Sequence, residues 1–313
     1  MKRNTLIKYG SIFGIIGNVF LFLIKIVVGI ISKSMAMLAD SLNSAGDVFA
    51  SLMTWIGNKI SSVPNDDDHN FGHGKAEYIF SLLISVSMLA VAIKLFYDSL
   101  ISIINENKLM FSWNLIIVCI ITFFIKMILY LYTKSIYKKT KSLLIKSNMI
   151  DHRNDMIITL FTTVAIFLTR LNVYFFDGIV GLGIAIWIFI TGIKIFKESY
   201  DVLMDTSLDN KTKNEILKII KKYRQIKKIG NIYSVPIGYK YIVVITIYVN
   251  GKMQTKNSHK ITDIIEEEVK REIVNIEQLI IHVEPYIEWN EHEIWIILVK
   301  RLVFSFFLLY NHT

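Results

Sequence analysis

The sequence predicts an α-helical membrane protein, a six-helix transmembrane bundle followed by a small α+β domain. Two observations lead to this fold class. The 313-residue chain is 53% hydrophobic, with a mean hydropathy of +0.47 and only three prolines, a composition unlike that of ordinary soluble domains. Its apolar residues also gather into stretches long enough to cross a bilayer as helices, which takes roughly 20 residues. There are six such stretches: 10–31, 35–61, 77–104, 112–134, 147–170 and 174–197.

The chain changes character after the sixth stretch. From about residue 205 it is polar and mixed, so we expect residues 1–204 to form the membrane domain and 205–287 to form a cytoplasmic domain. Residues 288–313 make an apolar tail to which we assign no role. Lys300 and Arg301 lie near the middle of this tail, and two adjacent cations argue against a seventh span.

The polar region has the periodicities of a small α+β domain. Apolar residues recur at helical spacing in two segments and alternate in three others. The order αββαβ is typical of a metallochaperone-like sandwich, with helices on one face of a sheet. The predicted helices cover 210–223 and 258–272, and the predicted strands cover 229–235, 239–249 and 279–283.

The basic residues predict the orientation in the membrane. If the N-terminus is cytoplasmic, ten lysines and arginines precede the cytoplasmic domain on the inside, against three on the outside, which satisfies the positive-inside rule. We therefore expect a multi-pass protein of the cell membrane with both termini in the cytoplasm. The inside residues are Lys2, Arg3, Lys8, Lys59, Lys75, Lys134, Lys138, Lys139, Lys141 and Lys146, and the outside ones are Lys33, Lys108 and Arg170.

Composition also excludes several function classes. The basic run over 134–146 is an orientation signal that touches anionic lipid, so we expect no nucleic-acid partner. Cys119 is the only cysteine, which rules out an intramolecular disulfide and thiolate zinc sites. The N-terminus shows no cleavage pattern of a signal peptide. No catalytic arrangement or phosphate loop stands out, so we expect neither an enzyme nor a resident cofactor.

The most informative residues are polar ones inside two of the spans. Asn43 and Asp47 in the second stretch, and Asp151 and Asp155 in the fifth, are each four positions apart and so share a helix face. Carboxylates in hydrocarbon usually face an interior cavity and coordinate or pair with something. Three carboxylates and one amide converging near the midplane predict an oxygen-rich site for a divalent cation, whereas plain interhelical hydrogen bonding is the alternative.

Other polar residues in the spans are interpreted as structural. His152 follows Asp151 but is turned about 100° around the helix, so we do not count it as a ligand. Four lysines lie within or at the ends of spans, and we interpret them as snorkelling side chains without a specific role. These are Lys25, Lys94, Lys126 and Lys194.

Four motifs in this order resemble the cation diffusion facilitator family, six-helix antiporters of divalent metals and protons. The resemblance extends to about Pro285. The motifs are Leu38-Ala39-Asp40-Ser41-Leu42-Asn43-x-x-x-Asp47, Phe71-Gly72-His73-Gly74-Lys75-x-Glu77, Asp151-x-x-x-Asp155 and His282-Val283-Glu284-Pro285.

The resemblance implies roles for particular residues. It assigns the transport site to Asn43, Asp47, Asp151 and Asp155, and the absence of imidazole from these four positions is similar to the manganese-type branch. It implies a possible loop metal site at Asp66, His69 and His73, for which a merely polar loop is the alternative. It also implies a possible cytoplasmic metal site at His259, His282 and Glu284, an interdomain charge pair of Lys75 with Asp205, and a homodimer.

The resulting functional expectation is efflux of Mn²⁺, or Fe²⁺, in exchange for protons. Zn²⁺ or Cd²⁺ export by the same mechanism stays open, because zinc binds most sites more tightly than manganese does. Two alternatives come from other classes. A membrane-tethered metal sensor would not need the membrane aspartates, and a passive channel would show no proton coupling.

Overall fold

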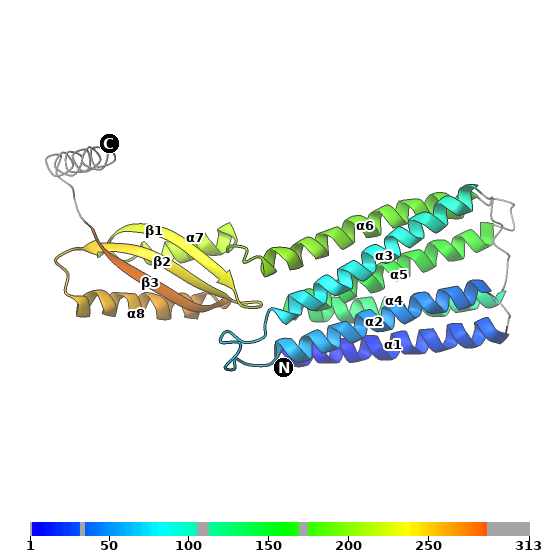
Figure 1. Ribbon diagram of the computed structural model, residues 1–313, viewed down its shortest axis with the longest axis horizontal. Coiled ribbons are helices and arrows are strands. Elements are labelled where there is room, and N and C mark those ends of the chain that lie inside the picture. The colour runs from blue at the N-terminus through cyan, green and yellow to red at the C-terminus, as the bar shows by residue number, and fades with distance from the viewer. Residues whose placement is uncertain (1, 32–34, 105–112, 169–174, 287–313) are drawn as a thin grey trace, which may run out of the picture. The chain divides into compact units, whose positions relative to one another are not determined.

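The computed structural model describes residues 2–31, 35–104, 113–168 and 175–286 (Figure 1). The contacts divide the chain into two units. The first comprises Met1–Thr206 with Pro236–Tyr239, and the second Ser207–Val235 with Lys240–Thr313. Each unit has its own packed interior.

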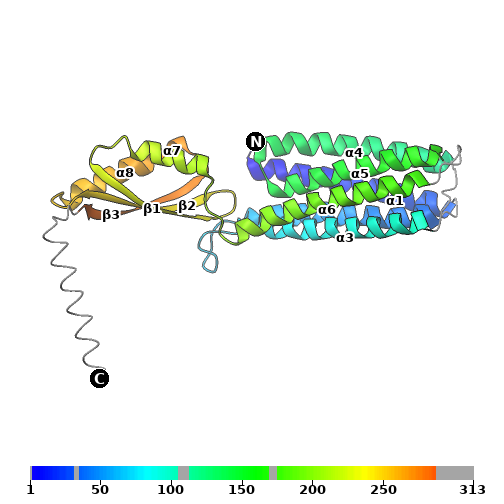
Figure 2. The same cartoon turned by 90° about the horizontal axis from the view of Figure 1, so that it is seen from above.

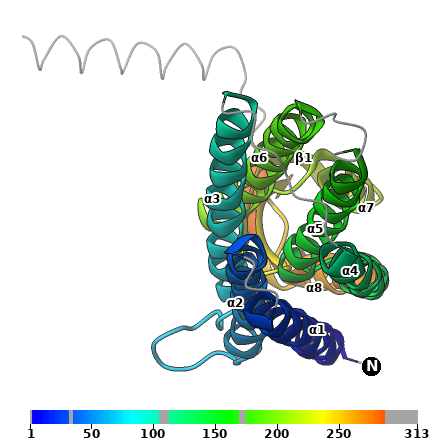
Figure 3. The same cartoon turned by 90° about the vertical axis from the view of Figure 1, so that its right-hand side faces the viewer.

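The first unit is a bundle of long helices. Figure 3 shows these helices nearly end-on. The tightest neighbours are α3 with α6, α1 with α2, and α4 with α5. The helices are α1 (Arg3–Ile31), α2 (Met35–Ser61), α3 (Ala76–Ile104), α4 (Trp113–Thr140), α5 (Leu143–Leu168) and α6 (Phe175–Leu203).

Many buried residues of the bundle are polar, and many of its large apolar residues are exposed. In α1, Ser11 and Asn18 are buried, whereas Ile16 and Phe20 are exposed. Such inversion suits helices surrounded by lipid, where small and polar residues mediate helix contacts. Within the described residues, α1, α3, α4 and the Gly178–Leu203 part of α6 are long and apolar enough to span a membrane. The other two helices, α2 and α5, carry the predicted polar pairs.

The second unit has the predicted order αββαβ. It comprises α7 (Asn210–Ile220), β1 (Ile226–Pro236), β2 (Tyr241–Asn250), α8 (Thr255–Glu272) and β3 (Ile276–Tyr286). The sheet order is β1-β2-β3, and β2 pairs parallel to β3, with Ile245 opposite Ile281. The crossover through α8 makes the parallel pairing possible. The fold-class prediction is therefore confirmed. Strands β1 and β3 extend beyond both predicted ends, whereas β2 begins two residues later and ends one residue later than predicted.

Both helices of this unit pack on one face of the sheet (Figure 2). Alternate residues of β2, Val243, Ile245, Ile247 and Val249, are buried in one cluster with apolar residues of α7 and α8. The period of two in β2 decides which face is covered. Asp209 caps α7, its Oδ1 accepting hydrogen bonds from the amides of Lys211 and Thr212, an arrangement typical of helix N-termini.

Candidate metal centre

Side chains of three helices meet inside the first unit. Lys126 Nζ of α4 donates a hydrogen bond to Asp47 Oδ2 of α2 at 2.7 Å, and another to Asp155 Oδ2 of α5 at 2.5 Å. The Lys126 side chain is only 1% exposed. One ammonium group therefore bridges two of the carboxylates that the sequence predicted would converge.

The interpretation of Lys126 as a snorkelling side chain is wrong. A snorkelling lysine keeps its ammonium group at the membrane surface, whereas this one is buried against two carboxylates. Lys25 of α1 is also buried, and it interacts electrostatically with Asp155. Lys94 donates a hydrogen bond to Asn43 Oδ1 at 3.4 Å. Lys94 and Lys194 are both exposed, as expected.

Asp151 completes a group of three carboxylates, Asp47, Asp151 and Asp155, which we call the carboxylate cluster. Ligand atoms of Asp151, His152 and Asp155 all lie within 4.8 Å of one another. Asp151 also interacts electrostatically with Asp47 and Lys126, and its Oδ2 is buried without a hydrogen-bond partner. The cluster thus has unsatisfied acceptor capacity beside the Lys126 bridge.

The surroundings of the cluster hold its main chain in place and leave other polar atoms unpaired. Asn18 Nδ2 of α1 donates to the Asp47 carbonyl oxygen at 3.1 Å and to Ser51 Oγ at 2.9 Å. The side-chain amide atoms of Asn148, one turn before His152 on α5, are buried without a partner. Buried polar groups normally find partners, so these amide atoms hold unused hydrogen-bonding capacity one turn along α5 from His152.

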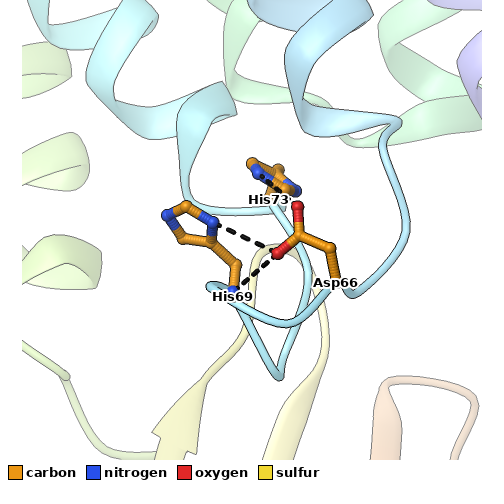
Figure 4. A group of neighbouring side chains, drawn as sticks. All are labelled: Asp66, His69 and His73. Carbon is orange, nitrogen blue, oxygen red and sulfur yellow. Dashed lines mark hydrogen bonds and ion pairs between the residues drawn. The ribbon is translucent and has the colours of Figure 1, made fainter.

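The structure also gathers the predicted loop residues (Figure 4). Between α2 and α3, ligand atoms of Asp66, His69 and His73 lie within 4.8 Å of one another. Asp66 Oδ1 accepts the His69 backbone N–H at 2.6 Å, and its Oδ2 lies 3.6 Å from His73 Nε2. The hydrogen bond from the His69 amide is the main cause that lowers the pKa of Asp66, so this exposed carboxylate is ionised and available to a cation.

The cytoplasmic residues are not gathered in this way. His282 Nε2 on β3 lies 2.8 Å from Glu284 Oε1, whereas His259 on α8 pairs with Asp263 at 3.5 Å. In the part of the chain that the structure describes, His259, His282 and Glu284 do not form a ligand cluster. A metal site from these residues would need a change in side-chain positions or ligands from another chain.

The remaining predicted pair lies within the first unit. Lys75 Nζ donates to Asp205 Oδ1 at 2.6 Å. Asp205 has a positive φ of 58° at the end of α6, a conformation that aspartate tolerates better than most residues. Both side chains are substantially exposed, so the ion pair contributes little stability by itself.

Comparison with known proteins identifies this architecture. Residues 11–204 match the family model of the cation efflux transmembrane domain, and residues 208–286 match that of the cation efflux protein cytoplasmic domain. The chain belongs to the cation efflux, or cation diffusion facilitator, family. This cation efflux protein is therefore a multi-pass membrane transporter of metal cations and not an enzyme.

Two relatives come from Bacillus subtilis (strain 168). The manganese efflux system protein MneP is 27% identical over 294 residues, covering 92% of this chain and 99% of the relative. The manganese efflux system protein MneS is 28% identical over 280 residues, covering 88% of this chain and 94% of the relative. The metal-bound C-terminal domain of the CzcD transporter from Thermotoga maritima aligns with 26% of this chain and 100% of that structure, at 26% identity and a TM-score of 0.25.

Proposed function

We propose that this cation efflux protein exports Mn²⁺ from the cytoplasm in exchange for protons, by alternating access, through a transport site of Asn43, Asp47, Asp151 and Asp155. The observation that carries the proposal is the convergence of membrane carboxylates from α2 and α5 on one ammonium group, that of Lys126. A position that holds a cation between two partly buried carboxylates suits a transported metal ion, because intramembrane charges are kept where they pair or bind.

Donor chemistry supports manganese as the ion. The four residues offer carboxylate and amide oxygens, which suit Mn²⁺ better than they suit softer metals. Two relatives that align over most of this chain are named manganese efflux proteins. Fe²⁺, Zn²⁺ and Cd²⁺ are the alternative ions. Iron and zinc compete because most ligand sets bind them more tightly than they bind manganese.

Lys126 gives the mechanism a defined starting state. In the absence of metal, its ammonium group bridges Asp47 and Asp155, so these partly buried carboxylates are not left unpaired. A divalent ion arriving from the cytoplasm takes the position between the same oxygens, and Lys126 moves aside. When the bundle opens outward, protons compete for these carboxylate oxygens and the metal leaves. Metal and protons then exclude each other at one site, which is sufficient for exchange.

The remaining parts of the proposal concern assembly and regulation. We assign both termini to the cytoplasm from the distribution of lysine and arginine along the chain. The protein works as a homodimer in the lipid bilayer, with the cytoplasmic domains paired. Asp66, His69 and His73 bind a second metal ion outside the spans. His259, His282 and Glu284 bind metal only with rearrangement, and Lys75 with Asp205 acts at the hinge after α6.

A transport assay with several metals tests the proposal. Purified protein in liposomes is supplied with Mn²⁺, Fe²⁺, Zn²⁺ or Cd²⁺, and uptake is followed with an internal metal-sensitive dye. We expect Mn²⁺ uptake that is lost in Asp155→Ala. Uptake of Zn²⁺ alone would overturn the ion assignment. No uptake of any metal, with metal still bound through His259 and His282, would favour a membrane-tethered sensor.

A further inference from the structure

His152 is a buried imidazole without a partner. Its side chain lies on α5 with an exposure of 0%. Neither Nδ1 nor Nε2 has a hydrogen-bond partner among the residues that the structure describes. Leaving a buried polar group unsatisfied costs free energy, and an imidazole has two such groups. A histidine that served only to fill space would be replaced at no such cost by an apolar side chain.

The helix places His152 beside the carboxylate cluster. His152 and Asp155 are three residues apart, so they are neighbours on the helix surface. Each contributes a ligand atom, with a third from Asp151, and the three atoms lie within 4.8 Å of one another. Two ligands on opposite sides of a metal ion, each at about 2.1 Å, are about 4.2 Å apart. A small inward movement therefore closes the three atoms around one ion.

We propose that His152 is a ligand of the transported ion, together with Asp151 and Asp155. This inference rests on the proposed transport site and adds a nitrogen donor to its oxygen ligands. Asp151 Oδ2 is buried and free of hydrogen bonds, while Lys126 occupies Asp47 and Asp155. Asp151 Oδ2 and the two ring nitrogens of His152 are therefore the groups of this set that no hydrogen bond occupies in the described structure.

A nitrogen ligand also sets the specificity of the site. Carboxylate and amide oxygens alone suit Mg²⁺ and Ca²⁺ as well as Mn²⁺, whereas imidazole suits transition metals. His152 thus gives the site its preference for a transition metal over Mg²⁺. Replacing His152 by glutamine, which offers an amide oxygen, should weaken Mn²⁺ binding by at least about tenfold, the smallest effect usual for ligand-supporting groups, and should let Mg²⁺ compete.

Pulsed electron paramagnetic resonance of bound Mn²⁺ tests the inference without relying on transport. Nitrogen coordinated to Mn²⁺ modulates the electron spin echo at ¹⁴N frequencies. The chain has seven histidines, so the decisive sample is the full-length protein in which the other six are changed to glutamine. These are His69, His73, His259, His282, His292 and His312. Mn²⁺ alone is the probe, and Asp155→Asn in the same background removes the site.

We expect ¹⁴N modulation from this single-histidine protein and its loss when His152→Gln is added. Mn²⁺ bound in an Asp155-dependent manner without ¹⁴N modulation would overturn the role of His152 and leave the transport site standing. Binding that is indifferent to Asp155→Asn would overturn the transport site itself. If the six substitutions prevent folding, the wild type and His152→Gln are compared, and modulation that is equal in the two proteins refutes the inference.

Discussion

Replacing Lys126 by methionine removes the cation that the protein holds between Asp47 and Asp155. Methionine is unbranched and flexible, so it fills much of the space of the lysine chain without its charge. In the wild type, a metal ion can bridge the two carboxylates only after both hydrogen bonds from Lys126 are broken. The variant has no such bonds to break, and we expect it to bind Mn²⁺ more tightly.

The size of the effect follows from the two contacts. Hydrogen bonds to charged groups contribute about 1.5–3 kcal/mol each, so displacement of Lys126 costs about 3–6 kcal/mol if both are lost. Each 1.4 kcal/mol is a factor of about ten in affinity. Protonation of the unpaired carboxylates in the variant offsets part of this gain in binding free energy. We therefore take the lower end of the range, about 3 kcal/mol. We expect the Kd for Mn²⁺ to fall by about 100-fold.

Isothermal titration of Mn²⁺ into purified protein at fixed pH measures this Kd. Lys194→Met is the matched control, because Lys194 lies on α6, is exposed, and makes no contact with the carboxylate cluster in the described structure. We also expect Lys126→Met to turn over more slowly, since a tightly held ion leaves slowly. A folded Lys126→Met protein whose affinity for Mn²⁺ is unchanged or weaker would show that Lys126 does not compete with the metal.

Three further predictions concern other parts of the structure. In α2, Gly57→Ala should lower the free energy of unfolding by about 1–3 kcal/mol, because the added Cβ would lie 2.7 Å from the Phe80 side chain. The Cβ added in Gly46→Ala meets nothing within 4 Å, so this variant should not lose stability. Asp209→Ala should destabilise the cytoplasmic domain by about 1 kcal/mol in denaturant unfolding. Its hydrogen bonds lower the pKa of Asp209, so the difference is present above the ordinary aspartate pKa and is lost as pH falls through the lowered value. Glu268→Gln should bring the pKa of Tyr223 down from about 12 toward its ordinary value, because the Glu268 carboxylate accepts a hydrogen bond from the Tyr223 hydroxyl. Difference absorbance titration measures this pKa. A Tyr223 pKa that stays near 12 in Glu268→Gln, or equal stability of the two glycine variants, would contradict these assignments.

Much of the candidate site can be predicted from the sequence, because residues four apart share a helix face however the helix packs. Asp151 and Asp155 are four residues apart, and this alone puts them on one face of α5. Their meeting with Asp47 of α2 follows from the high cost of carboxylates in lipid, which leaves the bundle interior as the place for them. The free-energy cost of carboxylates in lipid and their spacing of four residues together predict which helix faces point into the bundle. This prediction needs no knowledge of how the helices pack.

Lys126 could not be paired from the sequence, because its partners lie on two other helices. One signal does point to its burial. Lys126 lies near the middle of α4, far from either end, and a lysine there cannot reach the membrane surface as easily as one near a terminus. The turn of about 100° from Asp151 argues against His152 as a ligand. Its spacing of three from Asp155 is the relation that places it beside the cluster.

The cytoplasmic domain shows the same division between local and non-local information. Alternation in β2 and the helical period of α8 predict the elements themselves. The pairing of β2 with β3 is different, because no local pattern specifies which strands lie side by side or in which register they pair. The distance between His259 and His282 likewise depends on how α8 packs on the sheet, so their separate ion pairs could not be predicted from spacing. The apolar tail 288–313 lies outside the described residues.

Proton movement driven by Mn²⁺ directly tests whether metal and protons exchange at the carboxylate cluster. Liposomes containing the protein and a pH-sensitive dye receive external Mn²⁺, and the wild type is compared with Asp155→Ala. We expect proton release from the liposomes as Mn²⁺ enters, and no such release in Asp155→Ala. Mn²⁺ entry without any proton movement, or proton movement that persists in Asp155→Ala, would contradict this expectation.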